Sequence, residues 1–465
     1  MASSLTQLLN TARDGLTAQS YGLGVTGQNV ANVNTPGYVR REALLETHAL
    51  GTATTGTVHA AGLRRVTDQF LERRVYESTS LSSAAREHDQ RLASVEALYD
   101  DLSGTGLGSS VDALFQSFSR LAANPSDPTV RLSVLDSADG LSQRVRDTAD
   151  VVAQSREDLL KDAQAVVGQV NDNAQAIARL NKQIAVAESQ GGDAADLKDQ
   201  RNRLLLDLAS LVDVRTIMSG SGSLIVQSSG TTLVEGGEAR QLSIDLAGDG
   251  SLRLLASREG GPPTEITRFL TGGRLAGIQE ARDVDLFDVA SKLDRFVFDV
   301  ATAVNAQHAA GFGLDGVDGR DLFDVTATAT GAARALRISA DVAGNPSALA
   351  ASGSATAGPG NSDNAALLSA LSGQSVVFGN TRTAAQAYGD LVGDVATRKA
   401  RAASMVESRE AIHAQIQAMH EAMSGVSLDE EFVNLTKFQR AYEASARVLS
   451  TVDELLQELI NRVGR

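Results

Sequence analysis

The C-terminal stretch of this chain carries a heptad pattern that constrains the fold more than any other feature. Large apolar residues recur at alternating steps of three and four across residues 428–463, and only Glu431 and Ser445 place polar atoms in the stripe. This spacing predicts one long helix with an a/d stripe. Each apolar side chain gains roughly 1.5 to 3 kcal/mol when buried, but only if a second surface covers it. The helix therefore requires a partner. The apolar members are Leu428, Leu435, Phe438, Tyr442, Leu449, Val452, Leu456, Leu459 and Val463.

The N-terminal stretch offers a similar but weaker apolar surface. Its larger apolar residues step by fours and threes, with small and polar residues between them. Two such stripes at the two ends predict that the termini pair with each other, with neighbouring copies, or with both. A bundle closed within one domain is the alternative interpretation. The candidate interface residues here are Leu5, Leu9, Leu16, Leu23 and Val30.

Composition excludes several classes of function. The net charge of -15 argues against a nucleic-acid surface, although arginine pairs begin at Arg40, Arg64 and Arg73. We interpret these pairs as local salt-bridge or interface groups. Without cysteine, the chain can form neither disulfides nor thiolate metal sites. The N-terminus has no basic segment followed by an unbroken apolar run, so no Sec signal is expected. The sequence contains no run of about 18 apolar residues, so no membrane span is expected either.

Periodicity along the chain predicts a mainly α protein with inserted β domains. The stretch 130–187 keeps a helical spacing without proline, which is far longer than a globular helix and predicts a rod. Short β runs separated by glycine-rich turns follow at 212–269. The first helix is expected to lose regularity near Gly22, Gly24 and Gly27. Further helices are predicted at about 68–102, 111–121, 197–211, 275–309 and 384–423, with glycine-rich breaks at 104–108 and 191–192.

These elements suggest a division into three parts. The terminal helices, 1–38 and 425–465, would pair in a coiled-coil-like core domain. Residues 39–211 and 271–424 would form a helical rod domain that contains a mixed segment at about 311–379. Residues 212–270 would form an inserted outer β domain.

No stretch predicts catalytic, cofactor-binding or metal-binding residues. Residues 22–27 match G-x-G-x-x-G, but a helical stripe precedes them where a dinucleotide site needs a strand. The acidic segment 315–321 lacks EF-hand spacing and is expected to be a turn. His413 and His420 lie a heptad apart, too far for a zinc pair, and are interpreted as a solvated helix face. His308 has no candidate nucleophile beside it. We therefore expect no enzyme and no cofactor.

The stretch 27–38 resembles the N-terminal signature of the bacterial flagellar axial proteins, which comprise rod, hook and hook-associated proteins. Asparagines before Pro36 and Gly37 provide turn chemistry, because Pro36 fixes φ and Gly37 accepts a positive φ. The matching residues are Asn29, Asn32, Asn34, Thr35, Pro36, Gly37 and Tyr38.

Four later motifs narrow the resemblance to the members of this family that form the hook-filament junction. They occur in family order over nearly the whole chain, whereas residues 212–270 match least. The motifs are Asn124-Pro125-Ser126-Asp127-Pro128 with Arg131, Gly272-Gly273-Arg274-Leu275-Ala276-Gly277, Val304-Asn305-Ala306-Gln307-His308 with Gly311, and Gly425-Val426-Ser427-Leu428-Asp429-Glu430-Glu431 leading to Tyr442-Glu443-Ala444-Ser445-Ala446.

The resemblance implies a structural role in a tubular assembly. It implies self-association in a ring, contact with hook protein and with the second junction protein, and type III export to the cell exterior without a cleaved signal. It also implies that an export chaperone covers the C-terminal helix before secretion. The alternatives are another flagellar axial protein, such as hook protein or the second junction protein, a wall hydrolase carried at an appendage tip, and a secreted adhesin.

Overall fold

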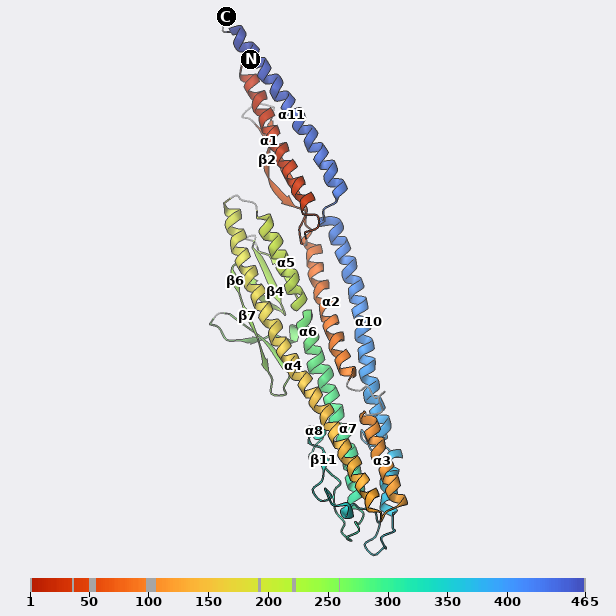
Figure 1. Cartoon of the computed structure of the whole chain (residues 1–465). Coiled ribbons are helices and arrows are strands. Elements are labelled where there is room, and N and C mark those ends of the chain that lie inside the picture. The colour runs from red at the N-terminus through yellow and green to blue at the C-terminus, as the bar shows by residue number, and fades with distance from the viewer. Residues whose placement is uncertain are drawn as a thin grey trace.

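The fold is an elongated bundle of helices with the two chain termini together at one tip (Figure 1). The computed structural model describes residues 2–35, 37–49, 56–97, 106–190, 194–219, 223–258 and 260–463. The predicted fold class, mainly α with inserted β elements, is confirmed. The predicted breaks at 104–108 and 191–192 lie partly or wholly outside the described residues.

Helices supply the length of the molecule. The helices are α1 (Ala2–Ala31), α2 (Gln69–Glu96), α3 (Leu107–Ala123), α4 (Pro128–Ser189), α5 (Ala195–Leu211), α6 (Gly273–Gln279), α7 (Leu286–Ala309), α8 (Ala332–Ala335), α9 (Asp363–Ala370), α10 (Ala384–Ser424) and α11 (Leu428–Val463). A π-helical turn, Glu280–Asp285, joins α6 to α7. The expected loss of regularity near Gly22, Gly24 and Gly27 is wrong, because α1 continues through all three glycines.

The strands form small antiparallel sheets against these helices. One sheet has the order β3-β4-β5-β6, and a second has β7-β8-β9. Two further sheets have two strands each, the β1-β2 hairpin and the pair of β10 with β11. The strands are β1 (Arg41–Ala49), β2 (Gly56–Arg65), β3 (Arg215–Met218), β4 (Leu224–Ser228), β5 (Thr231–Glu235), β6 (Glu238–Ala239), β7 (Gln241–Leu246), β8 (Leu252–Ser257), β9 (Thr264–Glu265), β10 (Phe323–Asp324) and β11 (Arg337–Ile338).

Helix α4 is the long rod that the spacing predicted, and it spans 62 residues. Asp127 caps its N-terminus by accepting from the backbone N–H of Thr129 at 2.8 Å, and Pro128 occupies the first turn, where no N–H is needed. Fully buried Arg131 donates to the carbonyl oxygens of Pro125 and Leu349 at 2.6 and 2.7 Å. These contacts account for the Asn124-to-Arg131 motif as a helix start fastened to a distant loop.

Side-chain amides fasten the two larger sheets to α4. Asn171 donates to the carbonyl oxygen of Leu242 at 2.9 Å and accepts from its N–H at 2.8 Å. Its amide group therefore pairs with the end of β7 as a neighbouring strand would. Buried Asn181 donates to the carbonyl oxygens of Leu224 and Gly236. The sheets thus lie against the middle and upper part of α4 (Figure 1).

An ionic cluster near the middle of the rod ties together three helices that are distant in sequence. Arg398 on α10 pairs with Asp285 in the π-helical turn at 3.0 Å and with Asp288 on α7 at 2.5 Å. His88 on α2 contacts the other oxygen of Asp285 at 2.6 Å. Because Asp285 is buried, its carboxylate depends on these partners.

The Gly272-to-Gly277 motif lies where α6 crosses α2 at close range. A Cβ added to Gly277 would lie 2.5 Å from the carbonyl oxygen of Ala84 and 2.9 Å from the Cβ of Glu87. Gly273 has φ of 75°, which favours glycine. The motif is therefore a close-packed helix crossing.

We expect Gly277→Ala to lower the free energy of unfolding by about 1 to 3 kcal/mol, because the backbone of α2 must move to admit the methyl group. Gly168→Ala is the matched control, since that exposed helical glycine has nothing within 4 Å and alanine there should stabilise α4 by up to about 1 kcal/mol. Denaturant unfolding of both variants measures the difference. Equal stability of Gly277→Ala and the unaltered chain would contradict the crossing as described.

His308, at the C-terminal end of α7, is buried in its neutral form. Its Nδ1 lies 2.7 Å from the carbonyl oxygen of Arg320, and its Nε2 accepts from the N–H of Ala350 at 2.9 Å. A second proton on the ring would have to bind Nε2, and the new N–H would then point at the N–H of Ala350. Burial lowers the pKa of His308 below its ordinary value of 6.5.

Stability should therefore fall as the pH drops below about 6.5. The unfolded chain binds the proton more readily than the folded chain in that range, so protonation favours unfolding, whereas above 6.5 neither state is protonated and the effect vanishes. Unfolding measured from pH 8 to pH 5 should show a shallower pH dependence in His308→Gln than in the unaltered chain. His420→Gln controls for the loss of a histidine on α10. An unchanged slope in His308→Gln would refute the assignment.

Candidate assembly interface

The two terminal helices pack against each other as an antiparallel pair. Three contacts define their register, and each is seven residues from the next on both helices. A Cβ on Gly15 would lie 3.2 Å from Ser445 Oγ, and one on Gly22 would lie 2.7 Å from the ring of Phe438. The third contact is a hydrogen bond of 3.0 Å from Asn29 to Glu431. Two heptad stripes therefore meet and run in opposite directions.

The contact side of α1 is made of small residues. Ala18, Gly22, Val25 and Asn29 are buried and step by fours and threes. The residues predicted for the N-terminal stripe are only half-buried: Leu5, Leu9, Leu16, Leu23 and Val30. The residues of α1 that come closest to α11 are Gly15, Gly22 and Asn29. Each lies one position before a predicted residue, namely Leu16, Leu23 or Val30. The signal in the sequence is the pair of glycines at heptad spacing, Gly15 and Gly22, which a pattern of large apolar residues does not include.

The predicted residues of α11 divide into two groups. Val452 is buried, and Leu435, Phe438, Leu449, Leu456 and Leu459 are half-buried, whereas Leu428 and Tyr442 are exposed. The two polar residues of the stripe, Glu431 and Ser445, meet Asn29 and Gly15. Helix α1 thus covers α11 only in part.

Asn29 is the centre of a polar cluster at the base of the pair. Its side chain is 1% exposed and makes four hydrogen bonds. The amide nitrogen donates to the carbonyl oxygen of Arg41 at 2.8 Å and to Glu431. The amide oxygen accepts from the N–H of Arg41 at 3.0 Å and from the hydroxyl of Tyr38 at 2.9 Å. Asn29 therefore joins α1, β1 and α11 with no polar atom left unpaired.

Arg40 fastens the first residues of α11. Its Nε donates to Glu431 at 2.9 Å, and it pairs with Glu430 at 2.6 Å. Its backbone N–H donates to the carbonyl oxygen of Ser424, the last residue of α10, at 3.0 Å. Glu431 is only 1% exposed, so its carboxylate is stabilised by Arg40 and Asn29 rather than by water.

Arg41 extends the cluster to the rod. It pairs with Asp196 and Asp199 of α5 at 2.5 and 2.8 Å, and Arg65 at the end of β2 also pairs with Asp199 at 2.8 Å. The guanidinium lies 4.8 Å above the ring of Tyr38. Burial raises the pKa of Tyr38, so its hydroxyl stays protonated and can donate to Asn29. Charged contacts thus link the terminal helices, the β1-β2 hairpin and α5.

The remaining signature residues shape the turn after α1. Asn32 donates to the carbonyl oxygen of Gln28 at 2.9 Å, and the hydroxyl of Thr35 donates to Asn32 at 3.1 Å. Gly37 has φ of 74°, and a Cβ there would lie 2.6 Å from the side chain of Arg203. Asn34 is exposed. Pro36 lies outside the described residues.

The other polar candidates make contacts with neighbouring residues of the fold. His413 does not lie on a wholly solvated face, because its Nδ1 is 3.0 Å from the hydroxyl of Ser78 on α2. Asp315 accepts from Val317 N–H and pairs with Arg320, as a turn predicts. Among the described residues, no group of three or more His, Asp or Glu side chains could hold a metal. No helix within the same ranges is long and apolar enough to cross a membrane.

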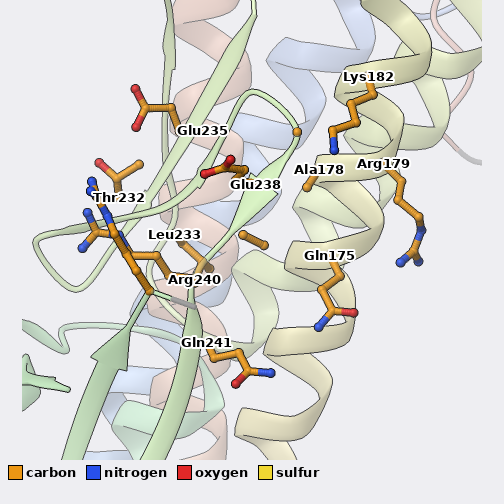
Figure 2. A pocket seen from close by; sticks show the side chains of 13 residues that line it. Gln175, Ala178, Arg179, Lys182, Thr232, Leu233, Glu235, Glu238, Arg240 and Gln241 are labelled. Atoms are coloured by element: carbon orange, nitrogen blue, oxygen red, sulfur yellow. The ribbon is translucent and has the colours of Figure 1, made fainter. Parts of the chain in front are cut away.

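A cleft of about 1070 Å³ lies between α4 and the β5-β6 turn (Figure 2). Arg179 and Lys182 line it from α4, and Glu235 and Glu238, which are paired residues of β5 and β6, line it from the turn. The guanidinium groups of Arg179 and Arg240 point to opposite sides of the cleft (Figure 2). Because these charges do not converge, the cleft presents no ligand site comparable to the contacts of the terminal pair.

Comparison with known proteins gives a consistent family. A model described as "Flagellar hook-associated protein FlgK helical domain" matches residues 92–323. Models described as "Flagella basal body rod protein" and "Flagellar basal body rod FlgEFG protein C-terminal" match residues 9–38 and 419–462. The ends of the chain thus resemble rod proteins, and the middle resembles a hook-associated protein.

Relatives match along the whole chain. A protein named flagellar hook-associated protein 1 from Bacillus subtilis (strain 168) is 27% identical over 500 residues, covering 98% of each chain. Its namesake from Escherichia coli (strain K12) is 25% identical over 546 residues, covering 98% of this chain and 100% of that one. The solved structure of the flagellar hook junction protein FlgK from Burkholderia pseudomallei superposes with a TM-score of 0.68 at 16% identity, covering 75% of this chain and 99% of that one, so the two share a fold.

We expect Asn29→Ala to loosen the terminal pair without unfolding the rod. The substitution leaves buried polar groups of Arg41 and Glu431 unpaired, at a cost of about 1 to 3 kcal/mol. Amide hydrogen exchange should accelerate in α1 and α11 and stay unchanged in α4. Asn34→Ala, which alters an exposed asparagine in the same segment, is the matched control. Exchange that accelerates equally in both variants would show that Asn29 has no special role.

Proposed function

The chain belongs to the family of flagellar hook-associated protein 1, and from this membership we propose that it forms the hook-filament junction as a ring of subunits joined through their terminal helices. The members of this family are structural components of the bacterial flagellum. No reaction is required of such a component. Its task is to bind neighbouring proteins and to transmit force between them.

The pattern of family matches supports the junction over other axial positions. Both ends match models of rod proteins, which accords with association among flagellar axial proteins. The long central segment matches the hook-associated helical domain instead. A hook protein or a rod protein would share the ends of this chain but not its middle.

The observation that carries the proposal is the apolar surface that remains on the terminal pair. Val433 and Ile460 are 68% and 67% exposed, and Phe432, Val448 and Leu455 are also exposed along α11. Leu8 is exposed on α1. Exposed apolar residues that follow one helix pair over its length are typical of a surface that other subunits cover.

Specific partners follow from the same surface. We propose self-association in a ring, with hook protein on one side and the second junction protein on the other. An export chaperone would cover the exposed apolar side of α11 before secretion, since that side would otherwise promote aggregation. The protein would leave the cell by type III export and act outside it.

The proposed division of labour along the chain keeps the boundaries suggested by the sequence. The terminal parts, 1–38 and 425–465, would form the inner assembly domain, and 39–211 with 271–424 would form the rod. Residues 212–270, which contain strands β3 to β9, would face outward. The hairpin β1-β2 contacts both α1 and α5, so it lies at the boundary between assembly domain and rod.

We expect Val433→Glu combined with Ile460→Glu to abolish attachment of filaments while leaving the monomer as stable as before. Both side chains are largely exposed in the monomer, so the new charges cost little until a neighbour buries them. Swimming in soft agar and counts of filaments per cell measure assembly, and thermal unfolding measures stability. Gln439→Glu with Ser450→Glu is the control, because both are exposed polar positions of α11. Normal filaments on cells with the Val433 and Ile460 variant would overturn the proposal.

A further inference from the structure

The exposed side of α10 carries an uncharged stripe five helical turns long. Met405, Ile412 and Met419 are spaced by seven residues and are 49%, 44% and 46% exposed, and Met423 continues the line at 49%. Small or uncharged residues fill the positions beside them. We call the following set the α10 stripe: Ser404, Met405, Ser408, Ala411, Ile412, Gln415, Ala418, Met419, Ala422 and Met423.

The stripe is distinct from the side of α10 that packs on α2. Ala402 and Ile416 are buried on that side, and His413 hydrogen-bonds to Ser78 there. The charged residues Glu407, Glu410 and Glu421 lie elsewhere around the helix. At 100° per residue, the stripe occupies a sector of about 140° without a charge. Such a sector on a solvated helix indicates a contact surface, because charged residues normally cover an exposed face.

We propose that a second copy of this chain packs on the α10 stripe in the assembled ring. This inference rests on the proposed function, since it assumes that the copies stand side by side. Subunits of a ring lie at the same level, so the body beside the rod of one copy is the rod of the next. The stripe ends five residues before Leu428, which like Phe432 and Val433 is exposed at the start of α11, where the proposed assembly surface begins.

The size of the stripe fits a contact that forms only within an assembly. Twenty helical residues span about 30 Å, and a strip about 10 Å wide gives on the order of 300 Å². A stable complex buries about 800 Å² on each partner. The stripe alone is too small to hold two free copies together. It becomes effective when the terminal helices already hold the copies beside each other at a high local concentration.

Methionine gives this contact a particular property. Three of the five methionines in the chain lie on the α10 stripe. Methionine side chains are flexible and polarisable, so they fill irregular gaps and repack when the surface opposite them shifts. A contact of this kind tolerates small sliding of one rod along the next.

Photo-crosslinking in flagellated cells tests which molecule covers the stripe. We replace Ile412 of the full chain with a benzophenone amino acid, and use Gln417, on another exposed side of α10, as the control position. The expected product at position 412 is an adduct of twice the 48.6 kDa chain mass that contains only this chain, with at least fivefold less at position 417. An adduct with any other protein, or none, overturns the proposal.

Charge substitution tests whether the contact matters. Met405→Glu with Ile412→Glu and Met419→Glu should leave the thermal unfolding of the monomer unchanged and reduce the number of filaments per cell severalfold. Ala403→Glu with Ala414→Glu and Gln417→Glu adds the same charge to other exposed positions of α10 and should have no effect. If the stripe variant assembles normally while Val433→Glu with Ile460→Glu does not, this inference fails and the proposed function stands. If both variants assemble normally, the proposed function fails as well.

Discussion

The contact between α1 and α11 is the interaction on which the rest of the molecule depends. It joins residues that are 402 positions apart, such as Asn29 and Glu431, and so brings both ends of the chain to one tip. Everything between must leave that tip and return to it, which the chain does through α2 to α5, the sheets and α6 to α10. An elongated shape follows, because α4 and α10 each run for many turns without a break.

The polar residues within the pair fix its alignment. An apolar heptad stripe can slide by a whole heptad and still bury a similar area. Asn29 opposes such a slide, because its hydrogen bond to Glu431 on α11 forms in only one register, and Arg40 donates to the same carboxylate. Buried polar pairs contribute little net stability, but here the pair selects one alignment among several of similar apolar burial. That selection places the exposed apolar side chains of α11 at fixed positions for neighbouring subunits.

The sequence predicted long elements well and close contacts poorly. The spacing of apolar residues over 130–187 predicted α4, and short β runs predicted the strands between Arg215 and Glu265. Gly22 was expected to disturb α1, yet the helix continues because Phe438 packs where a side chain would stand. Glycine lowers helix propensity locally, but close packing across the pair outweighs that cost. The register of the pair and the role of Arg41 likewise depend on residues far away in sequence.

The passage between the rod and the terminal pair consists of two chain segments side by side. One runs from α10 to α11 through Gly425, and the other runs from the end of β2 into α2, where the N–H of Val66 donates to the carbonyl oxygen of Arg40 and the N–H of Arg40 donates to that of Ser424. Two parallel tethers resist rotation about their common axis, because twisting would have to wind one around the other. The ion pairs of Arg41 and Arg65 with Asp199 of α5 also oppose tilting of the terminal pair against the rod. The crossing is thus built to pass torque from the rod to the terminal pair, as a coupling between two shafts in line does.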